Sequence, residues 1–285
     1  AIIPAPFYFL YPGEVAMAGG EVKYVETSAA NGFKITAAEL EANITARTRL
    51  LFLNTPLNPV GSVYSEAELK ELAVVLETHA QVVIICDEIY ERLVLDTSHA
   101  SLWVVAPALR DRILTFNSFS KPSGLSGLRI GWMQGPADIM AAVKRMKASM
   151  SYNTNTLAQV ALREALSSQD LFDREMDILR DRLRAGRNIL FDRLTDMGFS
   201  IPAAPAGMFL FPQVPESLQI PRLAIEEQTE LTRAEQFAHW LIPFAVTVAP
   251  GVDMGVNDRF RILFALEEQS IEEGMDRIQR ALASV

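Results

Sequence analysis

The chain has 285 residues, of which 49% are apolar and 21% charged, an ordinary balance for a globular protein and a length sufficient for two domains. A net charge of -9 without a Lys/Arg-rich run argues against nucleic acid as a partner, because such a surface must neutralise phosphates. The single cysteine excludes an internal disulfide and fits a reducing compartment. No apolar run reaches membrane-spanning length, and Pro4 and Pro6 interrupt the N-terminal apolar stretch, which also lacks a basic leader. We therefore expect a cytoplasmic protein with small-molecule partners and no membrane association.

Strand and helix patterns alternate from Glu21 to about Gly135, which predicts a doubly wound, mostly parallel sheet. Capping boxes at Thr36 and Ser65 predict the starts of two helices that pack on this sheet. The second helix should place Leu69, Leu72, Ala73 and Leu76 on one face. Strands are expected at residues 50–53, 82–86, 113–116 and 128–133.

The second part of the chain has a different pattern. An apolar stripe over residues 173–197 predicts a long helix that crosses between two domains, with the boundary near Asp181. Beyond it we expect strands within residues 199–212 and 246–250 and a closing helix at 271–282, with a surface loop or lid from Val214 to Leu231. The fold class is therefore α/β. Residues 1–180 form a three-layer α-β-α large domain, and residues 181–285 form a smaller α+β C-terminal domain.

One lysine segment carries the strongest chemical signal. Ser118-Phe119-Ser120-Lys121 emerges from the carboxyl end of a predicted strand, where ligands bind in open α/β sheets, and Arg129 follows eight positions later, before Gly131-Trp132. A lysine between hydroxyls and an arginine at a chain reversal is typical of a residue that carries a phosphorylated aldehyde. A solvated surface lysine is the alternative.

Three other polar segments are candidates for the same site. Asp87 follows five apolar residues, where an ionised carboxylate is costly unless it is paired, and an N-cap is the alternative. Arg261 lies in a strand-like apolar segment and should face a substrate carboxylate, with a structural ion pair as the competing interpretation. The third segment, from Asn54 to Gly61, contains Asn58-Pro59, which by itself indicates a turn.

Taken in order, the segments Asn-Pro-Val-Gly, Asp-Glu-Ile-Tyr, Ser-Phe-Ser-Lys with its arginine, and Arg-Ile-Leu-Phe-Ala resemble the fold-type I pyridoxal-phosphate enzymes, specifically the aspartate aminotransferase superfamily, class I/II. The resemblance covers essentially the whole chain. It implies pyridoxal 5'-phosphate as cofactor, a homodimer, and ping-pong transfer of an amino group between an L-amino acid and a 2-oxoacid.

The resemblance also implies roles for the residues around the cofactor ring. Lys121 bonds covalently to the cofactor aldehyde and later acts as general base. Asp87 keeps the pyridine nitrogen protonated. Tyr90 and Asn58 donate to the phenolic oxygen, and Tyr8 stacks on the ring, although Tyr90 and Tyr8 both have core packing as an alternative.

The phosphate and the substrate have their own implied residues. Ser118, Ser120 and Arg129 bind the phosphate, with a surface salt bridge as the alternative for Arg129. Arg261, together with Asn58, binds the substrate carboxylate. Family members carry three further features ahead of the residues that match here, namely an N-terminal arm, a small-residue phosphate loop at a helix N-terminus, and a tyrosine that reaches across the dimer. Relative to the family, the large domain is N-terminally incomplete, which leaves Ser118 and Arg129 to provide most of the phosphate contacts.

Other functions fit the same segments. A C–S β-lyase or a cyclopropane-forming synthase would use the same cofactor residues, because the fold does not fix the reaction. A non-enzymatic sensor domain of a transcription regulator and an inactive scaffold are further alternatives. No second arginine is present at residues 149–156, which favours neutral or aromatic over dicarboxylic amino acids.

The histidines His79, His99 and His239 lack metal-ligand spacing and are expected on helices or the surface, so no metal site is predicted.

Overall fold

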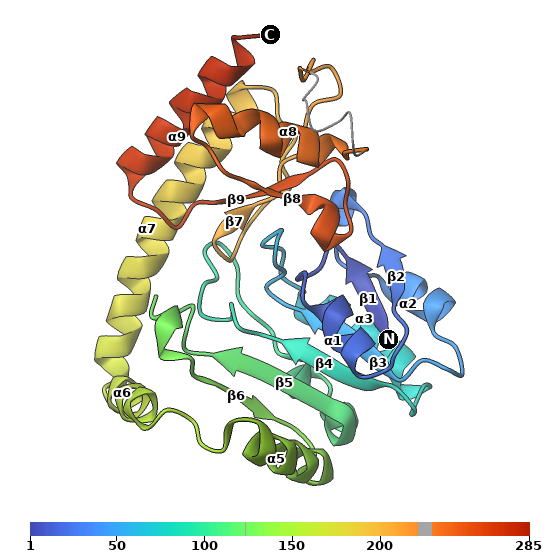
Figure 1. Ribbon diagram of the computed structural model, residues 1–285. Coiled ribbons are helices and arrows are strands. Elements are labelled where there is room, and N and C mark those ends of the chain that lie inside the picture. The colour runs from blue at the N-terminus through green and yellow to red at the C-terminus, as the bar shows by residue number, and fades with distance from the viewer. Residues whose placement is uncertain (123, 222–229) are drawn as a thin grey trace.

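The computed structural model describes residues 1–122, 124–221 and 230–285 (Figure 1). A six-stranded sheet has the order β2-β1-β3-β4-β5-β6, in which every pair is parallel except the antiparallel pair of β5 and β6. Its strands are β1 (Ile2–Ala5), β2 (Lys23–Glu26), β3 (Leu50–Asn54), β4 (Val83–Asp87), β5 (Ile113–Ser118) and β6 (Gly131–Gln134). The expected mostly parallel sheet is confirmed.

Helices cover both faces of this sheet because successive strand residues point to opposite sides. On one face, the apolar side chains Ile2, Leu51 and Ile84 pack with α2 (Ala37–Asn43), α3 (Glu66–Glu77) and α4 (Leu102–Val105). On the other face, Ile3 and Phe52 pack with α1 (Tyr11–Met17). The arrangement is the expected three-layer α-β-α domain.

The two predicted capping boxes are present. The Thr36 hydroxyl accepts from the Glu39 amide at the start of α2, and the Ser65 hydroxyl accepts from the Glu68 amide at the start of α3. The four residues expected on one face of α3 are all buried: Leu69, Leu72, Ala73 and Leu76. Local sequence therefore determined where both helices begin and which face they bury.

Three neighbouring strands end in polar residues at the same edge of the sheet. Asn54 at the end of β3 pairs in register with Asp87 at the end of β4, and Asp87 pairs with Phe116 of β5. Because these strands are parallel, their carboxyl ends meet, and Ser118 ends β5 at the same edge. The prediction that polar motifs gather at one sheet edge is confirmed.

The rest of the chain contains helices and a small sheet of order β7-β9-β8, in which both strand pairs are antiparallel. Figure 1 shows the long α7 running from the large sheet to α8 and α9. The elements are α5 (Ala137–Ser151), α6 (Thr156–Ser167), α7 (Gln169–Asp196), β7 (Phe209–Leu210), α8 (Arg233–Leu241), β8 (Ala249–Pro250), β9 (Phe260–Leu263) and α9 (Glu268–Leu282). Among the described residues, no helix has the length and apolarity to cross a membrane.

Several expected boundaries were wrong. The strand expected at 128–133 begins only at Gly131, because a 3-10 turn ends at Leu128 and Arg129 adopts a left-handed conformation with φ +52°. The strands expected within 199–212 and 246–250 shrink to two residues each, and three prolines, which lack a ladder donor, fall within the first range. Strand β1 and helix α1 were not anticipated. Of the loop expected at 214–231, residues 222–229 lie outside the described residues, and the rest contains neither helix nor strand.

The packing of α7 supports the two-domain division, which we retain as a proposal. Phe172 and Met176 near its start belong to a cluster with Phe119, whereas Leu183 and Leu190 belong to a core formed mostly by the C-terminal part together with residues 90–95. The change from one cluster to the other falls around the boundary proposed near Asp181.

Candidate active site

Asp87 occupies the end of β4, where two donors hold its carboxylate. The Tyr11 hydroxyl donates to Asp87 Oδ2 at 2.5 Å, and the Ile89 amide donates to Oδ1 at 3.2 Å. Burial raises the pKa of Asp87, while both hydrogen bonds and the nearby Lys121 ammonium oppose this rise. Asp87 is therefore an oriented carboxylate in a poorly solvated position, as a partner for a cationic ring nitrogen requires.

Asn58 lies on a loop that is hydrogen-bonded to the end of β4. The Asn54 side chain donates to the Asp87 carbonyl at 2.9 Å and accepts from the Asn58 amide at 2.8 Å. The Asn58 side chain, which is buried, then accepts a hydrogen bond at 3.1 Å from Nη1 of Arg261. Residues more than 200 positions apart in sequence thus meet at one edge of the sheet.

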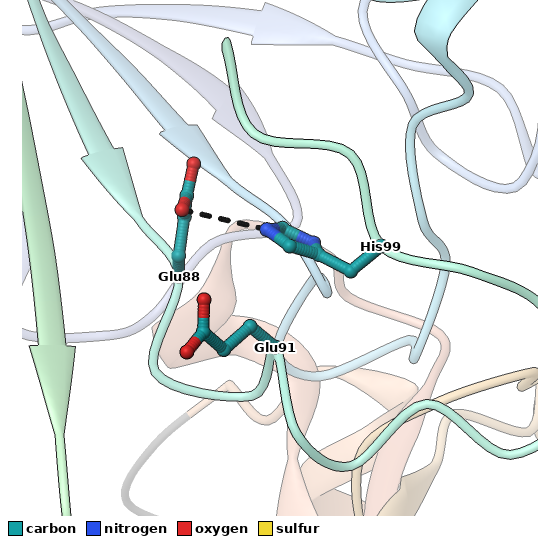
Figure 2. A group of neighbouring side chains, drawn as sticks. All are labelled: Glu88, Glu91 and His99. Atoms are coloured by element: carbon teal, nitrogen blue, oxygen red, sulfur yellow. Dashed lines mark ion pairs between the residues drawn. The ribbon is translucent and has the colours of Figure 1, made fainter. Parts of the chain in front are cut away.

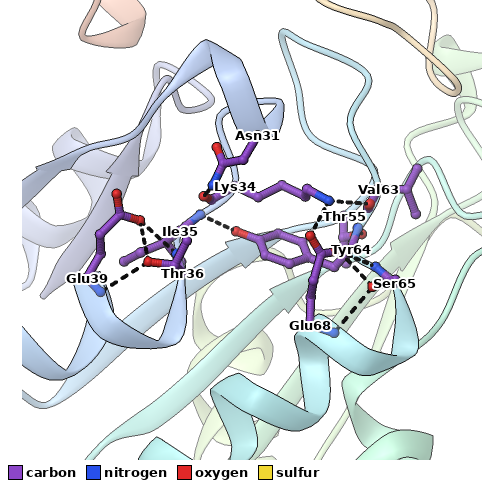
Figure 3. A network of polar contacts seen from close by, with 10 residues as sticks. All are labelled: Asn31, Lys34, Ile35, Thr36, Glu39, Thr55, Val63, Tyr64, Ser65 and Glu68. Atoms are coloured by element: carbon purple, nitrogen blue, oxygen red, sulfur yellow. Dashed lines mark hydrogen bonds and ion pairs between the residues drawn. The ribbon is translucent and has the colours of Figure 1, made fainter.

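A polar network behind this loop fixes its far end (Figure 3). The Tyr64 amide donates to the Thr55 hydroxyl at 3.3 Å, and the buried Tyr64 hydroxyl accepts from the Ile35 amide at 2.8 Å. Lys34 forms an ion pair with Glu68 above this tyrosine. The network connects the capped starts of α2 and α3 to the loop that carries Asn58.

Gly61 closes the same loop in a conformation that requires glycine. Its φ is +86°, and a Cβ at this position would lie 2.4 Å from the Ala206 carbonyl oxygen. The loop therefore packs directly against the backbone that leads into β7.

Lys121 lies in the turn that follows β5, half-buried. Its Nζ is 5.8 Å from the centre of the Tyr90 ring. Burial lowers the pKa of Lys121, and the positive charges of Arg261 and Arg129 lower it further, against the opposing effect of Asp87. The amine is thereby shifted towards the neutral form that attacks carbonyl carbons.

Arg261 on β9 is a partly buried cation without a carboxylate. Its guanidinium stacks on the Phe209 ring at 4.4 Å, and no carboxylate of the described residues lies within 4.0 Å of it. Burial lowers its pKa, partly offset by Tyr90 and Tyr8. Among the described residues, no carboxylate is close enough to form the structural ion pair that was the competing interpretation of Arg261.

Tyr8 and Tyr90 lie near each other and near Arg261. Tyr90 is 2% exposed, and burial followed by the Asp87 charge raises its pKa. Tyr8 is half-buried, with its ring edge-on to Tyr11 at a centroid distance of 5.5 Å. Tyr8, Tyr90, Asp87, Lys121 and Arg261 influence one another electrostatically, so the structure brings these five predicted residues together.

The three residues predicted for phosphate binding are engaged with the local backbone. The Ser118 hydroxyl donates to the Ile130 carbonyl at 3.0 Å and accepts from the Ser120 amide at 3.1 Å. Arg129 is exposed and donates to the Ser126 carbonyl at 3.0 Å. The two serines thus adjoin Lys121, while the Arg129 side chain points back along its own turn.

A cluster of Glu88, Glu91 and His99 lies beside the site (Figure 2). His99, expected on a helix or the surface, is largely buried, with Nε2 3.4 Å from Glu88 Oε2. Glu88 is 2% exposed and also accepts from the Ser101 hydroxyl at 2.8 Å. The three donor groups lie within 4.8 Å of one another, a set that could hold a divalent cation. Because the Glu88 carboxylate already contacts His99 and accepts from Ser101, we interpret the cluster as a structural contact that holds the segment after β4.

Sequence reasoning missed two residues that organise the site. Tyr11 was one of four aromatics in a five-residue run, and nothing in that run distinguished the one that reaches Asp87. Asn54 opens the loop motif, and its position at a strand end was the available signal. Only the parallel pairing of β3 and β4 places it beside Asp87.

Comparison with known proteins shows which family the chain resembles. The sequence profile of the aminotransferase class I and II family matches residues 1–278. Aspartate aminotransferase of Geobacillus stearothermophilus is 32% identical over 282 residues, covering 98% of this chain and 69% of the relative. Aspartate/prephenate aminotransferase of Cereibacter sphaeroides is 33% identical over 290 residues, covering 100% of this chain and 70% of the relative.

Solved structures give the same result. Thermus thermophilus aspartate aminotransferase with maleate superposes with a TM-score of 0.88 at 28% identity, covering 98% of this chain and 69% of the other. The aromatic aminotransferase of Pyrococcus horikoshii superposes with a TM-score of 0.88 at 27% identity, covering 99% of this chain and 73% of the other. The chain belongs to the aminotransferase class I and II family.

Proposed function

We propose that this site binds pyridoxal 5'-phosphate and performs the amino-group transfer of the family between an L-amino acid and a 2-oxoacid. The proposal depends above all on one observation, a lysine with a lowered pKa beside an oriented carboxylate and an arginine without a carboxylate partner among the described residues. When bound, the cofactor supplies an aldehyde that accepts an amino group and a protonated ring that withdraws electrons.

Lys121 is the covalent anchor and the general base. Its amine would hold the cofactor aldehyde and, once released by a substrate amine, would take the α-proton of the substrate. Both roles need a neutral amine near the operating pH. Burial together with Arg261 and Arg129 favours that form.

The carboxylate and hydrogen-bond donors of this chain fit the cofactor ring. Asp87 offers an oriented anion to a ring nitrogen, which favours the protonated ring. Tyr90 and the Asn58 amide can donate to a phenolic oxygen on the other side of the ring. Tyr8, half-buried with its ring beside Tyr11, can stack on the ring face.

Arg261 binds the carboxylate that amino acids and oxoacids share. It already donates to Asn58, which keeps the guanidinium oriented, and its remaining N–H groups can donate to both oxygens of a carboxylate in a fork. Several relatives are named aspartate aminotransferases. Aspartate is therefore the first donor to test, against the preference for neutral or aromatic amino acids inferred from the sequence.

Phosphate binding, assembly and location complete the proposal. Ser118 and the exposed Arg129 would bind the phosphate by exchanging their present hydrogen bonds to backbone carbonyls, and the neighbouring Ser120 would contribute its hydroxyl. A homodimer is supported by large apolar side chains exposed along α5 and α6 and in the turn between them, among them Met146, Met150, Tyr152 and Leu157. We also retain the cytoplasmic location expected from the sequence.

The test is covalent trapping at Lys121. The purified chain is incubated with pyridoxal 5'-phosphate, reduced with borohydride and mapped by mass spectrometry. We expect the adduct on Lys121 and its loss in Lys121→Ala, whereas Lys144→Ala, which removes an exposed lysine of α5, should retain it. An adduct spread over surface lysines would contradict the proposal.

Product analysis separates amino transfer from the alternatives. A 2-oxoacid that accumulates only when an acceptor oxoacid is supplied indicates transfer. A product formed without an acceptor indicates a β-lyase or a cyclopropane-forming reaction. Binding of cofactor without any product indicates a sensor domain.

A further inference from the structure

Tyr11 makes the shortest hydrogen bond to the Asp87 carboxylate among the described residues. Its hydroxyl donates to Oδ2 at 2.5 Å, and its side chain is 6% exposed. It lies at the first position of α1, and its ring packs against Phe52 at 4.8 Å and edge-on to Tyr8 at 5.5 Å. The phenol therefore has a fixed direction and reaches Asp87 across a separation of 76 residues in the sequence.

We propose that Tyr11 is a positioning residue that keeps Asp87 ionised and aimed at the ring nitrogen, an inference that rests on the proposed function of Asp87. The hydroxyl can act only as a donor to an ionised carboxylate, because such a carboxylate has no proton to donate. The bond is thus strongest when Asp87 carries the charge that a cationic ring requires.

The surroundings of Asp87 make this donor necessary. Burial and the charge of Glu88 raise the pKa of Asp87, and Glu14 of α1 is a further carboxylate that interacts with it. The opposing groups are the Tyr11 hydroxyl, the Ile89 amide and the Lys121 ammonium. Lys121 loses its charge when it acts as an amine, which leaves the two hydrogen-bond donors to hold Asp87 in its ionised form.

The role of the Tyr11 hydroxyl can be tested separately from the packing of the Tyr11 ring. Tyr11→Phe keeps the ring against Phe52 and Tyr8 and removes only the donor. Tyr64→Phe is the matched control, because it also removes a buried tyrosine hydroxyl, one that accepts from the Ile35 amide and makes no contact with Asp87. Any loss of stability common to both variants is then separate from an effect on Asp87.

The decisive measurement is the pKa of Asp87 in the cofactor-free chain, followed by carbon-13 NMR of labelled aspartate carboxyls and assigned with Asp87→Asn. We expect Tyr11→Phe to raise this pKa and Tyr64→Phe to leave it in place. Incorporation of 3-fluorotyrosine at position 11 gives a more acidic donor of similar size and should lower the pKa. An Asp87 pKa that is unchanged both in Tyr11→Phe and in the fluorinated protein would overturn the inference. The fluorinated protein decides the question even if Tyr11→Phe fails to fold.

A second measurement connects the bond to the cofactor. Tyr11→Phe should bind pyridoxal 5'-phosphate several-fold more weakly than the unchanged chain, and this weakening should disappear in the Asp87→Asn background. Equal affinities in the Asp87 background would refute positioning. If the unchanged chain forms no adduct at Lys121, the proposed function fails, while the NMR titration still establishes or refutes the coupling between Tyr11 and Asp87.

Discussion

Replacement of Arg261 with methionine tests the substrate-carboxylate site most directly. The guanidinium donates to Asn58 and stacks on Phe209, with no carboxylate of the described residues within 4.0 Å. A bound carboxylate would accept two charge-assisted hydrogen bonds, each contributing about 1.5 kcal/mol, the low end of the usual range because Arg261 is only partly buried. Their loss, about 3 kcal/mol, corresponds to a fall in kcat/KM of roughly 100-fold to 200-fold.

The assay compares two amino donors under single-turnover conditions, with the cofactor absorbance as the signal. One donor is an amino acid, and the other is the corresponding amine without a carboxylate. Arg261→Met should lower the ratio of the amino acid rate to the amine rate by the predicted factor, because the loss of the Arg261 charge near Lys121 affects both reactions alike. Arg259→Met is the control, because Arg259 is a buried arginine that donates to the Phe211 carbonyl and to Gln213. This variant should lower Tm without changing the ratio of the two rates.

Stability provides an independent check on the same variant. Burial lowers the pKa of Arg261, which means that the folded protein disfavours the charged form. Methionine removes this penalty and retains the apolar contact with Phe209 but loses the one hydrogen bond to Asn58, so the ligand-free Tm should fall by less than in Arg259→Met, which loses two hydrogen bonds. Equal slowing of both donors, or a Tm that falls at least as far as in Arg259→Met, would refute the assignment of Arg261 as an uncompensated carboxylate receptor.

Three further predictions concern other parts of the site and its support. Asp87→Asn should raise the ligand-free Tm at pH 7, because burial raises the pKa of Asp87 and the ionised form costs stability. The gain should vanish as the pH falls below about 3.9, where the carboxyl is protonated in both states. Gly61→Ala should lower the free energy of unfolding by roughly 2–4 kcal/mol in urea titrations through backbone strain and the clash with Ala206, whereas Gly13→Ala, with open space at its Cβ, should change it by under about 1 kcal/mol. Arg112→Met should cost roughly 3–5 kcal/mol by the same measurement, because it leaves three backbone carbonyls around the end of α3 without their donor. A loss under 1 kcal/mol would show that water replaces that donor.

Parallel strand order explains why the sequence could locate most of the site. Asp87 follows a run of apolar residues and Ser118 ends a mostly apolar strand, and a polar residue at the end of a buried strand lies at the ligand edge of the sheet. The capping boxes at Thr36 and Ser65 have similarly local causes, since they depend on residues three positions apart. These features are determined by neighbours in sequence.

Contacts between distant segments were decided by the tertiary structure. Of residues 7–11 only Tyr8 and Tyr11 carry a hydroxyl, and which of them reaches Asp87 depends on how α1 packs on the sheet. The pairing of Arg261 with Asn58, and the burial of His99 against Glu88, join residues whose separation carries no periodic signal. The lowered pKa of Lys121 was also decided by the tertiary structure, because it depends on burial and on charges brought near the amine by folding.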